Sequence, residues 1–70
     1  MTPLKTRQVM VGDLVRALGG GSAVARVIGV SPSAVSNWQR LGRFPARTYL
    51  QIRRRLKAKG KSAPEQLWGM

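Results

Sequence analysis

The stretch GSAVARVIGVSPSAVSNW, which runs from Gly21 to Trp38, predicts two short helices joined by a tight turn at Gly29. Glycine suits such a turn because it adopts positive φ angles without a steric penalty. Apolar residues on both sides of the turn have the spacing that lets one short helix brace another. These residues are Val24, Ala25, Ile28, Val30, Val35 and Trp38. The second helix therefore buries one side and leaves a polar face exposed.

That exposed face carries side chains that form hydrogen bonds. Its members are Ser33, Ser36, Asn37 and Arg40. They are of a size that can reach base edges in a groove of duplex DNA. The alternative for the two serines is that they are merely small solvated residues.

The chain before this segment predicts one further helix, over about Val9–Leu18. Its buried stripe consists of Val11, Leu14, Val15 and Leu18. These positions recur at the spacing of one helix face. Residues 1–7 are expected to form a flexible arm, and glycines 19–21 mark the end of the helix. Ser22 is a good N-cap, so the next helix is expected to begin there and to run to about Ile28.

The helix that follows Gly29 has well-marked ends. Ser31 is a suitable N-cap, and Pro32 fits the first helical position because no amide donor is needed there. The helix is expected to continue to about Leu41, and Gly42 closes it.

A fourth helix is predicted from about Pro45 to Lys59. Its apolar stripe consists of Ala46, Tyr49, Ile52 and Leu56. In the tail, residues 61–70, the pattern Ser62-Ala63-Pro64-Glu65 resembles a capping box and predicts one short helical turn. Three apolar residues then either fold back on the core or form a dimer seam: Leu67, Trp68 and Met70. The sequence predicts one all-α domain of four to five helices.

The charge of the chain indicates a polyanionic partner. Thirteen Lys and Arg residues stand against two acidic residues, a net charge of +11 on 70 residues. Nucleic acid is the first candidate and an anionic membrane surface the second. The apolar residues form a multi-helix core pattern rather than one amphipathic stripe, which argues against the membrane surface.

Length and composition exclude several classes of protein. Seventy residues bury a small core, and the absence of Cys and His excludes a disulfide framework and the common zinc sites. A partner subunit is then the most plausible source of extra stability. No apolar run approaches the roughly 20 residues that span a bilayer. We also expect no secretory signal at the start of the chain. We expect a cytoplasmic, nucleoid-associated protein without membrane contact.

The central segment resembles the helix-turn-helix of Cro-like phage repressors and of related small antitoxin-type regulators, over about Val9–Tyr49. That family has a small residue four positions before the turn glycine, and apolar residues that flank it and follow six and nine positions later. The matching residues are Ala25, Gly29, Ile28, Val30, Val35 and Trp38. Many phage repressors carry Gln at the start of both helices, where this chain has Gly21 and Pro32-Ser33. No known operator sequence can therefore be carried over.

The resemblance implies that the second helix lies in the major groove and that its exposed side chains contact bases. The implied base-contacting residues are Ser33, Ser36, Asn37 and Arg40. Asn37 suits adenine, and Arg40 suits either guanine or a phosphate. Phosphate contacts are expected from Ser22, Ser31, Arg43 and Arg47. For each arginine the alternative is a solvated side chain without a contact.

Other chemistry finds little support in the sequence. Trp38 and Tyr49 are either stacking platforms for bases or core residues, and their helical spacing favours the core. Asp13 and Glu65 are the only acidic residues, which are too few for a persuasive catalytic site. The run Gly19–Gly21 is not a phosphate-binding loop, because no strand precedes it and no Gly-Lys-Ser/Thr sequence directly follows it. We expect no enzyme activity, no cofactor, no metal and no small-molecule ligand.

The sequence thus predicts a sequence-specific regulator of transcription that binds double-stranded DNA, with a Cro-like repressor as the first expectation. The resemblance implies a homodimer on a palindromic operator whose half-sites lie about one helical turn apart. Two alternatives remain open. One is a sequence-tolerant architectural or recombination accessory protein. The other is an antitoxin-type regulator that also holds a partner protein.

Overall fold

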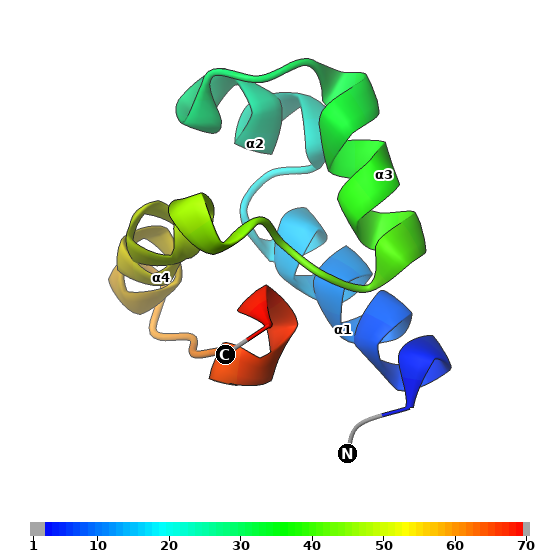
Figure 1. Ribbon diagram of the computed structural model, residues 1–70. Coiled ribbons are helices and arrows are strands. Elements are labelled where there is room, and N and C mark those ends of the chain that lie inside the picture. The colour runs from blue at the N-terminus through cyan, green and yellow to red at the C-terminus, as the bar shows by residue number, and fades with distance from the viewer. Residues whose placement is uncertain (1–2, 70) are drawn as a thin grey trace.

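The computed structural model describes residues 3–69, and this part of the chain is all-helical and contains no strand. Its helices are α1 (Leu4–Ala17), α2 (Gly21–Ile28), α3 (Pro32–Leu41) and α4 (Tyr49–Ala58), with two short 3-10 turns, η1 (Ala46–Thr48) and η2 (Glu65–Trp68). The expected all-α class is confirmed. Figure 1 shows α3 and α4 on opposite sides of the molecule, with η2 between α4 and α1. No helix within residues 3–69 is long and apolar enough to cross a bilayer.

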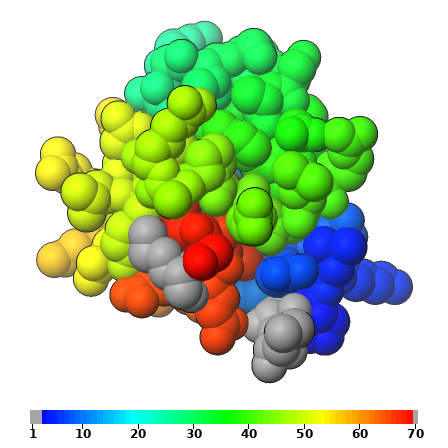
Figure 2. Space-filling model, viewed as in Figure 1, coloured from blue at the N-terminus to red at the C-terminus, as the bar shows by residue number. Residues whose placement is uncertain are grey.

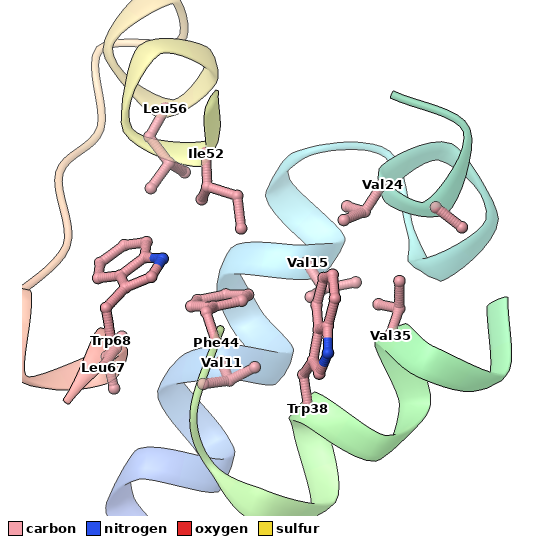
Figure 3. Close-up of a cluster of buried hydrophobic side chains, with 11 residues drawn as sticks. Val11, Val15, Val24, Val35, Trp38, Phe44, Ile52, Leu56, Leu67 and Trp68 are labelled. Atoms are coloured by element: carbon pink, nitrogen blue, oxygen red, sulfur yellow. The ribbon is translucent and has the colours of Figure 1, made fainter. Parts of the chain in front are cut away.

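The core is centred on Phe44, which lies in the irregular segment between α3 and η1 and is 1% exposed. Its ring packs between the indole rings of Trp38 and Trp68 (Figure 3). The ring centroids of Phe44 and Trp38 lie 6.1 Å apart, and their ring planes meet at 72°. The centroids of Phe44 and Trp68 lie 5.0 Å apart, with an angle of 26° between the ring planes. Such edge-on and offset-stacked pairs add about 0.5–1.5 kcal/mol each beyond the burial of their area. Sequence periodicity does not reveal Phe44, because it belongs to no helix.

Apart from Ala46, the apolar stripes predicted for the helices face this centre. The buried hydrophobic residues are Val11, Val15, Val24, Ala25, Val35, Trp38, Phe44, Ile52, Leu56, Leu67 and Trp68. Leu14, Leu18, Ile28, Val30 and Tyr49 are partly buried against them. Trp38 and Tyr49 are therefore packing residues rather than free stacking platforms.

The end of the chain folds back onto the core, which is one of the two alternatives for Leu67 and Trp68. The carbonyl of Leu67 accepts a hydrogen bond from the Phe44 amide at 2.7 Å. The indole Nε1 of Trp68 donates to Thr48 Oγ1 at 3.2 Å, and that hydroxyl donates to the Pro45 carbonyl at 2.7 Å. Figure 2 shows the surface of this segment between α4 and α1. Met70 lies outside the described residues.

The capping box expected at Ser62–Glu65 does not form. Pro64 is the N-cap of η2, and no side chain caps this turn. The Glu65 carboxylate instead accepts a hydrogen bond from the Tyr49 hydroxyl at 3.1 Å. This carboxylate therefore ties the tail to α4 rather than to its own backbone.

The expectation of a flexible arm over residues 1–7 is wrong for Leu4–Arg7, which form the first turn of α1. The reason is tertiary: the Gln8 side-chain amide donates to the Arg40 carbonyl at the end of α3. Helix ends leave such carbonyls unpaired, so this contact favours extending α1 toward the N-terminus. Residues 1 and 2 lie outside the described part of the chain.

Two other predicted boundaries differ from the structure. Gly21 is the first residue of α2 and Gly20 its N-cap, so Ser22 lies inside the helix and does not cap it. The predicted helix from Pro45 begins instead as the 3-10 turn η1, and Ala46 is exposed rather than part of the buried stripe. The change of pitch brings Thr48 inward, where it binds the Trp68 indole.

Gly42→Ala is expected to destabilise the domain by about 3 kcal/mol. Gly42 has φ 67°, and a Cβ there would lie 3.0 Å from both Arg7 Cβ and the Gln8 amide nitrogen. Left-handed backbone costs about 1–2 kcal/mol for a residue with a Cβ, and overpacking adds about 1–3 kcal/mol. Gly29→Ala is the matched control. Gly29 also has a positive φ, 85°, but a Cβ added there would have no atom within 4 Å. Urea denaturation should show the larger loss at Gly42, and equal losses would contradict this packing.

Trp68→Ala is expected to leave the domain largely unfolded at 25 °C. The change removes the stacking partner of Phe44 and the hydrogen bond to Thr48, and truncating a buried Trp costs about 3–5 kcal/mol. That loss approaches the whole stability of a small domain. Leu50→Ala, at a side chain that is 68% exposed, should change stability by less than about 0.5 kcal/mol. Thermal unfolding followed by circular dichroism measures both, and an unchanged unfolding temperature for Trp68→Ala would contradict a structural role for the tail.

Candidate nucleic-acid interface

The four side chains expected to contact bases lie together on one exposed face of α3, called here the polar face. They are Ser33, Ser36, Asn37 and Arg40, and they line one surface hollow of about 280 Å³. Their spacing is that of one helix face, while Val35 and Trp38 of the same helix are buried. At 10 residues, α3 is about 15 Å long. The structure thus presents these side chains as one continuous polar strip.

Both ends of α3 are fixed by groups that lie off the polar face. At the start, Ser31 Oγ accepts a hydrogen bond from the Ala34 amide at 3.3 Å, and Pro32 occupies the first turn. At the other end, the Gln8 side chain donates to the Arg40 carbonyl and Gly42 adopts the left-handed conformation. The helix is therefore held in place without using any side chain of the polar face.

Two side chains of the polar face are already paired with each other. Arg40 Nη2 donates a hydrogen bond to Asn37 Oδ1, and both side chains are exposed. Guanidinium has five N–H donors and an amide oxygen two lone pairs, so each group keeps bonding capacity for a ligand. The pair orients the Asn37 amide before any ligand binds.

Cations lie beyond both ends of the polar face. Arg43 follows α3 and borders a surface hollow together with Asn37 and Leu41. Arg47, in η1, lies beside the turn that precedes α3, in a hollow shared with Gly29. Both guanidinium groups are on exposed residues, as phosphate contacts require.

The two serines expected at phosphates occupy different settings. Ser22 is exposed in the first turn of α2, and the adjoining Gly21 lies against α3, where an added Cβ would be 3.9 Å from Val35. Amides in the first turn of a helix have no partner within the helix, so this end can accept an anion. Ser31 uses its oxygen to cap α3, which leaves its hydroxyl proton for a second partner.

Sequence reasoning missed two residues at the edge of this region. Leu41 is 51% exposed at the end of α3, beside Arg43. Gln51 is exposed and lines the same hollow as Arg47. Gln51 follows Arg47 by four residues, a spacing that places side chains on one helix face and could have indicated it. No pattern in the sequence marks Leu41.

No negatively charged side chain lies at the polar face or in the hollows around it. Asp13 pairs with Arg16 on α1 at 3.1 Å, and Glu65 accepts from Tyr49. Neither carboxylate lines the hollows around α3. An anionic ligand would therefore meet no repulsive side chain there. Within residues 3–69, no three metal-ligating side chains of His, Cys, Asp or Glu come together.

Comparisons of the chain with protein-family models, curated proteins and solved structures found no match.

Proposed function

We propose that this chain binds duplex DNA sequence-specifically and regulates transcription, with α3 in the major groove. The observation that carries the proposal is the polar face of α3, which is exposed, free of carboxylates and flanked by Arg43 and Arg47. A major groove about 12 Å wide admits one α-helix. Cations at both ends of the helix then meet the phosphates on either side of the groove.

In this proposal α2, the turn at Gly29 and α3 act as a helix-turn-helix of the Cro-like type. Gly29 adopts φ 85° at the end of α2, and Val24 and Ala25 of that helix are buried in the core. A single module of this kind contacts DNA over a small area, about 600–1,000 Å². A homodimer on a palindromic operator would double that contact. Repression by occupation of a promoter is the simplest output of such binding, and it requires no catalytic step.

Each polar side chain has a role that its chemistry suits. Asn37 presents a carboxamide that fits the N6 and N7 edge of adenine, and Arg40 fits guanine or a phosphate. The hydrogen bond between them places the two groups side by side in advance. Ser33 and Ser36 supply short donors and acceptors to neighbouring base edges. Arg43, Arg47, Ser22 and Ser31 set the register through phosphates.

A second candidate is a sequence-tolerant architectural DNA-binding protein. The observation that favours it is the set of exposed cations on α4, on the side of the molecule opposite α3 (Figure 1). They include Arg53, Arg54 and Lys57. Charge on two sides binds DNA without selecting a sequence. The ratio of specific to non-specific affinity separates this candidate from the first.

Asn37→Ala should relax base preference at one position of each half-site and cost about 1–3 kcal/mol of specific binding. The change removes the amide from the polar face but leaves Val35 and Trp38 in the core. Competition binding against a set of operators, each changed at one base pair, measures the effect. An equal loss of affinity for all sequences would contradict the base-contacting role.

Arg43→Ala and Arg47→Ala should each weaken binding to all sequences alike. Each lost phosphate contact lowers the slope of log K against log salt by about 0.9. Arg54→Ala removes the same charge from α4, on the other side of the molecule, and serves as the control. Titrations at several salt concentrations should show a lower slope for the first two variants alone. Equal slopes in all three would indicate that net charge, and not this face, binds the backbone.

A further inference from the structure

An apolar groove lies between α2 and α4, away from the polar face of α3. This α2–α4 groove has a volume of about 410 Å³. It is lined by Leu18, Val24, Val27, Ile28, Ile52 and Ala58, with Arg55 and Lys59 beside them. Val27 is 43% exposed, and Leu18 and Ile28 are only partly buried. Apolar surface on both sides of the groove thus remains open to solvent.

The cations beside the groove have a regular spacing. Lys59 follows Arg55 by four residues at the end of α4, so the two residues lie about 6 Å apart along the helix axis. Side chains four residues apart on a second helix have the same separation. A partner helix with two carboxylates at that spacing can therefore pair with both cations while its apolar residues enter the groove.

A second copy of this chain does not supply the complementary charge. Its two carboxylates, Asp13 and Glu65, are engaged with Arg16 and Tyr49. Two copies that met across the groove would bring Arg55 and Lys59 of both copies together, which places four positive charges side by side. Each copy also carries a net charge of +11. The apolar floor offers no hydrogen bond to base edges, so duplex DNA would use only the two cations and leave the floor uncovered. The groove shares no lining residue with the polar face of α3.

We propose that the α2–α4 groove binds an acidic amphipathic helix of a partner protein. Apolar side chains of that helix pack on Val27, Ile28 and Leu18, and its carboxylates pair with Arg55 and Lys59. An amphipathic helix in an apolar groove is a common mode of peptide recognition, anchored by residues three and four positions apart. This site goes beyond DNA binding and gives the protein a separate surface through which another protein can control it.

The test is a selection of phage-displayed random peptides on the immobilised full chain without nucleic acid, followed by fluorescence anisotropy of the enriched peptides. Val27→Glu and Arg55→Glu alter the groove at exposed residues. Leu50→Glu and Arg54→Glu are the matched controls, since they make the same changes at exposed residues of α4 that do not line it. Circular dichroism shows whether each variant is folded. If Val27→Glu does not fold, the comparison of Arg55→Glu with Arg54→Glu tests the groove by itself.

We expect enriched peptides that combine apolar residues at helical spacing with Asp or Glu. Their binding should fall at least tenfold in Val27→Glu and Arg55→Glu and stay within twofold in the controls. Three results would overturn the proposal: no enrichment, acidic peptides that bind all variants alike, or a concentration-dependent dimer that Val27→Glu abolishes. Because no DNA is present, these results leave the proposed DNA binding untouched.

Discussion

The packing of Phe44 between Trp38 and Trp68 is the interaction on which the rest of the structure depends. It joins the inner side of α3 to the end of the chain, and the Phe44 amide also donates to the Leu67 carbonyl. Trp68 in turn is locked to Thr48 by its indole N–H. Seventy residues without a disulfide have few other ways to close a core. Because this aromatic cluster holds the inner face of α3, the polar outer face of the helix stays exposed.

The elements with helical periodicity could be predicted from the sequence, and those fixed by tertiary contacts could not. The N-cap Ser31, the first-turn Pro32 and the C-terminal Gly42 indicate both ends of α3. The helix and its polar face can therefore be predicted from capping preferences and helical spacing alone. Phe44 and Thr48 lie in irregular or 3-10 segments, where no period indicates burial. Leu4–Arg7 are helical, and the next residue, Gln8, anchors this end of α1 to the Arg40 carbonyl, a contact between distant parts of the sequence. Glu65 had a local capping pattern, yet the Tyr49 hydroxyl binds it instead.

The distribution of charge separates two surfaces of different chemistry. Around α3, polar side chains lie between Arg43 and Arg47, and no carboxylate lines this surface. This surface suits a ligand that carries phosphates and hydrogen-bonding edges. Between α2 and α4, cations border an apolar floor, which suits an acidic and apolar ligand. A net charge of +11 alone would attract both ligands without distinguishing them. The distinction comes from what lies between the cations.

Sequence-specific recognition by α3 is the central claim, and a selection of bound duplexes from a random pool tests it most directly. The selection uses the full chain at near-physiological salt, because lower salt exaggerates non-specific binding. Recognition by α3 in the proposed homodimer predicts recovery of one inverted repeat, with half-sites about one helical turn apart. Recovery of nothing beyond a bias in base composition would contradict it, and would show that the charge of the chain binds DNA without reading its sequence.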